Sequence, residues 1–131
     1  MDPRVEKLAK TLVHYSTKIQ RGDRVLIDAV DGGRDLVKAL VREIYAVGGM
    51  PYVQLSDREI DRELLLGCTD EQLNLRAESE VAFLSKMQAT IRFVAVENDS
   101  ELSDVPAEQT ARFNRIVDDP IFDAIQKNGV R

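Results

Sequence analysis

The sequence has few of the side chains that support metal binding or nucleophilic catalysis. Its 131 residues include one histidine, one cysteine and no tryptophan, and aromatic residues make up 5%. With Cys68 as the single cysteine, no internal disulfide can form, which is typical of a reducing compartment. A hydrolytic site with two metals needs several converging His, Asp and Glu ligands. His14 alone cannot supply the usual imidazoles, so we expect no catalytic residue in this chain.

Two further absences exclude classes of partner. The net charge is −5 at pH 7, whereas a nucleic-acid binder usually has a basic face. No apolar run approaches the roughly 20 residues that cross a bilayer, and the first residues lack the apolar segment of a signal peptide. We therefore expect no nucleic-acid partner, no membrane partner and a cytoplasmic location.

Hydrophobic periodicity predicts alternating helices and strands. Apolar residues at helical spacing predict helices over 3–19, 33–47, 70–87 and 106–117. A short helix that restarts at Asp119-Pro120 follows them. Nearly continuous apolar runs predict strands over 24–29, 51–55 and 90–96. Two candidate capping boxes are present, at Ser56 with Glu59 and at Thr69 with Gln72.

Strands that alternate with helices imply βαβ units and a parallel sheet. A chain of this length is expected to form one domain. We therefore predict a single α/β domain over residues 1–131, built as a three-layer α/β/α sandwich of flavodoxin-like or Rossmann-like type. Its small, mainly parallel sheet has about three strands in the order 2-1-3. Val130-Arg131 follows the helix stop Asn128-Gly129 and reads as the start of another strand, so the sequence looks interrupted.

Four carboxylates form the one candidate cluster in the sequence. Asp28 and Asp31 lie around the end of the first predicted strand, and Glu97 and Asp99 follow the third. In open α/β sheets, ligands bind at this carboxyl edge, and clustered carboxylates can hold Mg²⁺. The simpler interpretation is that Asp31 caps a helix and the other acids are solvated. The Gly32-Gly33 pair lacks the spacing of a dinucleotide fingerprint.

The two remaining reactive side chains have structural interpretations. His14 lies on the polar face of the first helix near three lysines, which favours a solvated surface histidine. Cys68 has no base or cation among its sequence neighbours, although a nucleophilic cysteine usually needs one. We expect it to be a packed thiol.

Several segments together resemble the aminopeptidase T and aminopeptidase S family of bacterial metallo-aminopeptidases. In chain order they are Met1–Ala9 (MDPRVEKLA), Leu12–Ser16 (LVHYS), Arg21–Ile27 (RGDRVLI), Leu40–Pro51 (LVREIYAVGGMP), Ile91–Phe93, Asn98 and Glu101–Val105 (ELSDV). The resemblance covers essentially the whole chain, which corresponds to about the first third of a family member.

The resemblance implies a two-metal exopeptidase that removes amino-terminal residues from peptides. It also implies a cytoplasmic homodimer that uses zinc, cobalt or magnesium, with the metals bound in a later domain. None of those ligand motifs has a counterpart here, so no catalytic, cofactor or metal residue is carried over. The implied role is architectural: this truncated domain packs beside the catalytic domain of the same polypeptide and is inactive alone.

Two other hypotheses stay open. The first is a stand-alone flavodoxin-like module that uses the cluster of Asp28, Asp31, Glu97 and Asp99 for a cation or a phosphorylated ligand. The second is a purely structural or dimerising domain. An exposed apolar interface is also expected along the last helices, because removing a neighbouring domain uncovers apolar surface. Its candidate residues are Phe113, Ile116, Ile121, Phe122 and Ile125.

Overall fold

A computed structural model of the chain describes residues 2–95 and 104–131. The chain divides into two compact units. The first, here called the sheet unit, comprises Met1–Ser56, Met87–Val96 and Arg131. The second, the helical unit, comprises Asp57–Lys86 and Glu97–Val130. The assignment of residues 1–131 to a single domain stays a prediction.

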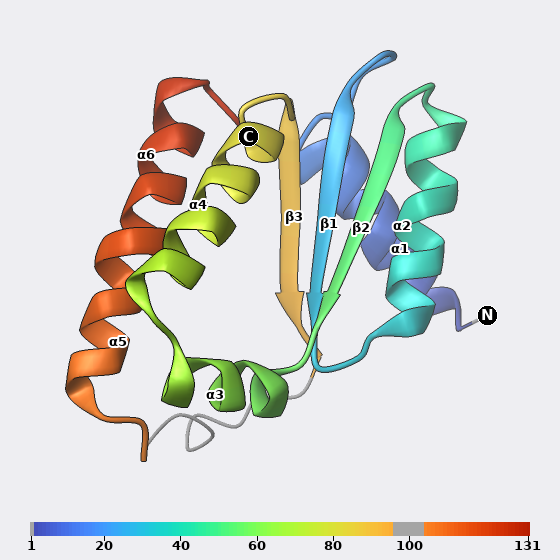
Figure 1. Cartoon of the computed structure of the whole chain (residues 1–131). Helices are drawn as coiled ribbons and strands as arrows, with labels where there is room; N and C mark the ends of the chain where they lie inside the picture. Colours follow the sequence, from blue (N-terminus) through green and yellow to red (C-terminus); the bar gives the residue numbers. More distant parts are fainter. Residues whose placement is uncertain (1, 96–103) are drawn as a thin grey trace. The chain divides into compact units, whose positions relative to one another are not determined.

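The sheet unit is built on three parallel strands. Strand β1 (Arg24–Val30) lies between β2 (Met50–Ser56) and β3 (Ala89–Val94), so the order is β2-β1-β3 (Figure 1). The predicted α/β sandwich class, the parallel sheet and the order 2-1-3 are confirmed. Strands β1 (RVLIDAV) and β3 (ATIRFV) are rich in β-branched and aliphatic residues, which pack well on a pleated surface, whereas β2 (MPYVQLS) is more mixed.

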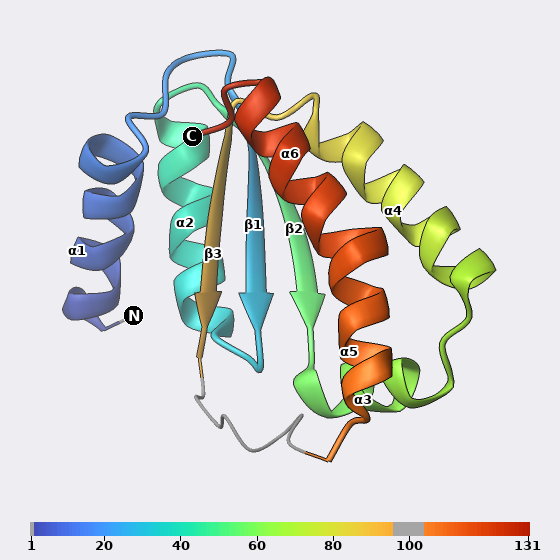
Figure 2. The same ribbon diagram turned by 90° about the vertical axis from the view of Figure 1, so that its left-hand side faces the viewer.

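Two helical segments cover one face of this sheet. Helix α1 (Pro3–Thr11) continues into the π-helical turn Leu12–Ser16, and helix α2 is Arg34–Ala46. Figures 1 and 2 show α1 and α2 on the same side of the strands. In register, Ile27 of β1 aligns with Ile91 of β3, and both belong to the core under the helices. The buried members of this core are Ala9, Val13, Ile19, Val25, Ile27, Ala29, Val37, Ala39, Leu40, Ile44, Ala89 and Ile91.

The first helical segment ends earlier than its apolar spacing predicts. The spacing extends to residue 19, whereas the helical turns stop at Ser16 and Lys18 has a φ of +50°. Ile19 nevertheless stays in the core, and its N–H donates to the carbonyl of Val13 at 2.9 Å. The reversal thus keeps the apolar side chain buried after the helix has ended.

The two outer strands of the sheet differ at their edges. Met50 donates its N–H to the carbonyl of Asp23, so the backbone groups of Met50 point toward β1. Because these groups alternate along a strand, the backbone of Pro51 points away from β1, toward the open edge of the sheet. Pro51 has no N–H to offer there, a placement typical of an edge strand. At β3, the N–H of Arg131 donates to Gln88 at 3.0 Å and its carbonyl accepts from Thr90 at 2.8 Å. Arg131 therefore makes backbone contacts like those of a parallel strand, although Val130 and Arg131 form no strand of their own.

The helical unit contains α3 (Arg58–Gly67), α4 (Asp70–Leu84), α5 (Ala107–Phe113), the π-helical turn Asn114–Asp118 and α6 (Asp119–Lys127). Its buried core consists of Cys68, Leu73, Ala77 and Val117. Phe113, Ile116 and Ile121 pack against this core. Three of the five predicted interface residues are thus partly buried against this core, whereas Phe122 is 60% exposed.

Helix α6 begins at Asp119 with Pro120 in its first turn, as the sequence predicts, but it follows the preceding helical turns without a break. Residues 113, 114, 118 and 119 all have right-handed helical dihedrals, so α5 runs through the π-helical turn into α6. Proline cannot donate to the helical ladder, and single π-helical turns accommodate such interruptions. The wider turn, in which Asp119 donates to the carbonyl of Asn114, lies directly before Pro120.

Helix α3 begins one residue later than predicted. Its N-cap is Asp57, whose carboxylate accepts from the N–H groups of Glu59 at 2.8 Å and Ile60 at 3.2 Å. The predicted capping box at Ser56 is therefore wrong, because Ser56 is the last residue of β2. The capping box of Thr69 and Gln72 at the start of α4 is confirmed. In the described ranges, no helix is both long and apolar enough to cross a bilayer.

Candidate functional site

The loop between β1 and α2 lies at the carboxyl edge of the sheet, where the sequence predicts ligands. Asp31, Gly32 and Gly33 have φ values of +60°, +106° and +83°, so the chain reverses through three consecutive residues with positive φ. The N–H of Asp31 donates to the carbonyl of Ser56 at 2.9 Å, which ties the loop to the end of β2. Gly33, and not Asp31, occupies the N-cap of α2. The interpretation of Asp31 as the cap is therefore wrong.

Close packing explains the glycine at this N-cap. A Cβ added to Gly33 would lie 2.4 Å from the ring of Phe93 on β3. The left-handed φ also disfavours any residue with a Cβ. The backbone of the loop and the aromatic ring thus approach each other as closely as only glycine permits.

Asp28 of β1 forms an ion pair with Arg92 of the neighbouring strand β3. It aligns with Arg92 of β3 in register, and the Arg92 Nε lies 3.5 Å from its Oδ2. The Asp28 side chain is 23% exposed, whereas that of Arg92 is 63% exposed. A guanidinium this close offsets the negative charge that a cation would need. Asp28 is therefore a poor starting point for a metal site.

The structure describes two of the four carboxylates in the predicted cluster, Asp28 and Asp31. Glu97 and Asp99 lie outside the described residues, so their approach to Asp28 and Asp31 stays a prediction. Within residues 2–95 and 104–131, no three His, Cys, Asp or Glu side chains form a group able to hold a metal ion. Nothing in that part of the chain favours the stand-alone cation-binding module over the other hypotheses.

His14 is exposed, as predicted, but it has an acidic neighbour. Its Nε2 lies 3.2 Å from Oε2 of Glu43, and the histidine side chain is 43% exposed. The two residues come from the π-helical turn after α1 and from α2, which pack together. The sequence placed His14 among lysines and missed this contact because the partners are 29 positions apart. The pair links two helices and has the geometry of a structural contact.

Cys68 is a packed thiol, as predicted. It is 4% exposed and belongs to the core of the helical unit. Gln109 donates its Nε2 to the Cys68 Sγ at 3.4 Å and to the carbonyl of Leu65 at 2.9 Å. Arg112 donates to the Cys68 carbonyl at 3.2 Å. These contacts hold the junction between α3 and α4 in place.

A pocket of about 190 Å³ opens in the helical unit, and the sequence analysis missed it. Leucines and an aromatic ring form most of its wall, with a thiol, an amide and a guanidinium among them. Its lining residues are Leu64, Leu65, Cys68, Gln72, Leu73, Arg76 and Phe113. The three consecutive leucines 64–66 were the available signal, since one face of α3 cannot bury all of them.

An ion pair of the helical unit involves Asp104. The Arg62 Nε donates to Oδ1 of Asp104 at 2.8 Å, and the Nη2 donates to Oδ2. This two-pronged hydrogen bond holds the pKa of Asp104 below its ordinary value of 3.8. Because Asp104 is exposed, the pair serves to link α3 to the residues before α5.

Comparison with known proteins identifies the family. The sequence profile of the thermophilic metalloprotease family (M29) matches residues 1–129. Among solved structures, wild-type AmpT from Thermus thermophilus has a similar fold, with a TM-score of 0.72 and 22% sequence identity. The match covers 94% of this chain and 33% of that chain, so this chain spans about a third of its solved relative. A search of curated sequences finds no match. On the family match over nearly its whole length, the chain belongs to the thermophilic metalloprotease (M29) family.

Proposed function

We propose that this chain is the amino-terminal domain of a two-metal aminopeptidase that removes amino-terminal residues from peptides. The observation that carries the proposal is the family match over residues 1–129. The solved relative supports it, since the similar region makes up only 33% of that chain and leaves room for a separate catalytic part.

The metal ions of such an enzyme do not fit the residues seen here. A two-metal centre needs several ligands that converge on both ions. In the described ranges no group of three ligating side chains occurs, Asp28 is paired with Arg92, and His14 is paired with Glu43. We therefore assign no metal ligand among the described residues and propose that the catalytic domain binds the zinc, cobalt or magnesium.

The proposed role of the chain is architectural. Its partners would be the catalytic domain of the same polypeptide, a second copy in a homodimer, and the peptide substrates of the whole enzyme. A cytoplasmic location agrees with the single cysteine, which is reduced and buried. In this proposal the sheet unit and the helical unit support the substrate cavity without contributing a catalytic group.

Peptidase assays test the proposal directly. The 131-residue chain and the complete product of its gene are assayed on leucine-p-nitroanilide with added Co²⁺ or Zn²⁺. We expect no hydrolysis by the 131-residue chain, and chelator-sensitive hydrolysis by the complete product. Chelator-sensitive turnover by the purified 131-residue chain would overturn the architectural role. Absence of peptidase activity in the metal-loaded complete product, on a panel of peptides, would overturn the aminopeptidase assignment.

A matched control separates this chain's own chemistry from a contaminant. His14→Gln removes the one imidazole of the chain while keeping a side chain that can still bond to Glu43. If trace activity in the 131-residue preparation persists in this variant, it does not come from His14. Its loss would show that His14 participates in catalysis and would contradict the proposal.

A further inference from the structure

The pocket in the helical unit combines an apolar wall with a guanidinium. The aliphatic part of the wall comes from Leu64, Leu65 and Leu73, and Phe113 adds a ring. Its volume of about 190 Å³ is below the roughly 300–1,000 Å³ of pockets for drug-sized ligands. A cavity of roughly 150 Å³ lined by such residues holds benzene. The pocket therefore has room for one aliphatic or aromatic side chain.

Arg76 gives this pocket a polar end. Its guanidinium lies over the Phe113 ring, 5.1 Å from the centroid, and its Nε donates to Glu80 at 2.9 Å. Both contacts fix the plane of the guanidinium. Among the described residues, no acceptor bonds to its two Nη atoms. The arginine side chain is 36% exposed, so these donors remain accessible to a ligand.

The two features together define a ligand chemistry. Two parallel N–H donors on a guanidinium match the two oxygens of a carboxylate. An apolar side chain attached to that carboxylate would move out of water and pack against the leucine-lined wall, which favours binding. We propose that this pocket binds the carboxylate-bearing end of an apolar residue with a side chain of leucine size. Such a group is found in a free amino acid and at the carboxyl terminus of a peptide.

Three probes test the ligand chemistry and its source. L-leucine, N-acetylglycyl-L-leucine and N-acetylglycyl-L-leucinamide are titrated into the 131-residue chain, and methyl NMR shifts of Leu64, Leu65 and Leu73 are followed. We expect saturable shifts with at least one of the two acids and none with the amide. Binding of leucine alone identifies a free amino acid as the ligand. Binding of the acetylated dipeptide, alone or with leucine, identifies a carboxyl terminus.

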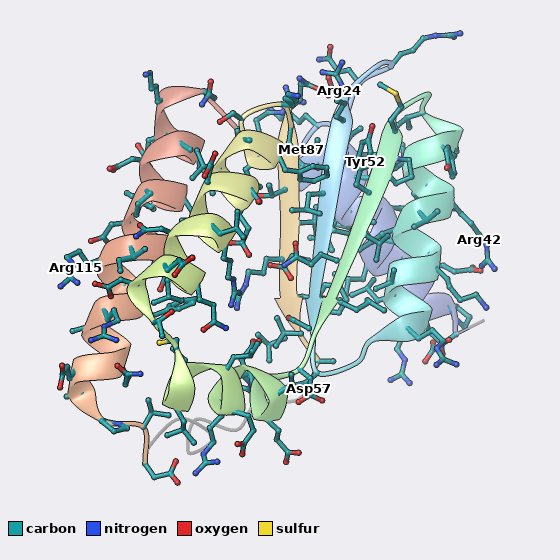
Figure 3. The ribbon with its side chains drawn as sticks, viewed as in Figure 1. Arg24, Arg42, Tyr52, Asp57, Met87 and Arg115 are labelled. Atoms are coloured by element: carbon teal, nitrogen blue, oxygen red, sulfur yellow. The ribbon has the colours of Figure 1, made fainter. Side chains whose placement is uncertain are left out.

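Two variants test the assigned contacts. Arg76→Met keeps an unbranched side chain over Phe113 but removes the donors, and we expect the affinity to fall roughly tenfold or more. Leu64→Trp fills the pocket from a position that is 44% exposed, and we expect it to abolish the shifts. The matched control is Arg115→Met, because Arg115 is exposed and Figure 3 shows it pointing away from α4.

The proposal fails on any of three results. These are the absence of saturable shifts with both acids, equal binding of the amide, and equal affinities in Arg76→Met and Arg115→Met. If Arg76→Met does not fold, Arg76→Lys replaces it, since a lysine keeps the charge but loses the paired donors. In that variant we expect weaker binding of the acids, and unchanged affinity would also overturn the assignment.

Discussion

The guanidinium of Arg131 pairs with the carboxylate of Asp23, although the two residues lie 108 positions apart. The same carboxylate oxygen accepts the N–H of Gln20 at 2.9 Å, just before β1. The Asp23 side chain is 15% exposed, whereas that of Arg131 is 42% exposed. Asp23 thus joins the loop before β1 to the residue that pairs with the edge of β3.

The two partners of this ion pair should differ in their contribution to stability. Asp23→Ala removes both the ion pair and the acceptor of the Gln20 N–H, so we expect a loss of about 0.5–1.5 kcal/mol in the free energy of unfolding. Arg131→Met removes only a half-exposed ion pair, with an expected loss of about 0–1 kcal/mol. Urea denaturation of both variants measures the difference. Equal losses would show that the ion pair, and not the backbone contact, carries the effect.

Gly33 should be the least replaceable glycine of the β1–α2 loop. Gly33→Ala forces a Cβ into the left-handed region, at about 1–2 kcal/mol, and against the Phe93 ring. Gly22→Ala is the matched control, since Gly22 has a φ of +86° but no atom within 4 Å of an added Cβ. We expect thermal unfolding to show the larger loss for Gly33→Ala. Phe93→Leu in the same chain should recover part of it, and no recovery would contradict the steric explanation.

The start of α3 offers a choice between two neighbouring caps. Asp57→Ala should reduce the free energy of unfolding by about 1 kcal/mol, because it removes the acceptor of two backbone N–H groups. Ser56→Ala should change it by less than about 0.5 kcal/mol. Chemical denaturation of the two variants decides between them. A larger loss in Ser56→Ala would restore the capping box predicted from the sequence.

Acid should weaken the contact between Arg62 and Asp104. Arg62 holds the folded-state pKa of Asp104 below 3.8, so this carboxylate contributes stability that is fully present above pH 3.8. The contribution is lost as the pH falls below 3.8 through the folded-state pKa. NMR titration of the Asp104 carboxyl should show its midpoint rise in Arg62→Met. An unchanged midpoint would mean that another group lowers the pKa.

Local patterns were enough to predict most of the fold. Runs such as Val25–Ile27 identify buried strands, and the alternation of strands with helices limits the topology to a few choices. The helix boundaries were harder to predict because neighbouring residues can each mark the start of a helix. Ser56 and Asp57 are both good N-caps, and the helix start at Asp119-Pro120 gives no sign that the preceding helical turns continue into it. Such choices depend on how far the neighbouring strand or helix extends.

The candidate site was less accessible to sequence reasoning. Arg76 and Phe113 meet across two helices, and no local pattern pairs them. His14 likewise finds Glu43 only after α1 packs on α2. Asp28 was a reasonable candidate ligand until the register brought Arg92 beside it. Long-range pairing determines the chemistry in each case, and a single sequence does not encode it in a readable spacing.

Pro51 makes the two edges of the sheet unequal in their capacity to pair with another strand. A foreign strand that approached β2 would meet one outward position without a hydrogen-bond donor, and a ladder interrupted there is weak. At β3, by contrast, the outward N–H of Thr90 already bonds to another strand-like residue. Copies of this protein therefore cannot join β2 to β2 in an uninterrupted ribbon. Pro51 thus removes the first outward donor of β2 and weakens edge-to-edge pairing at the start of this strand.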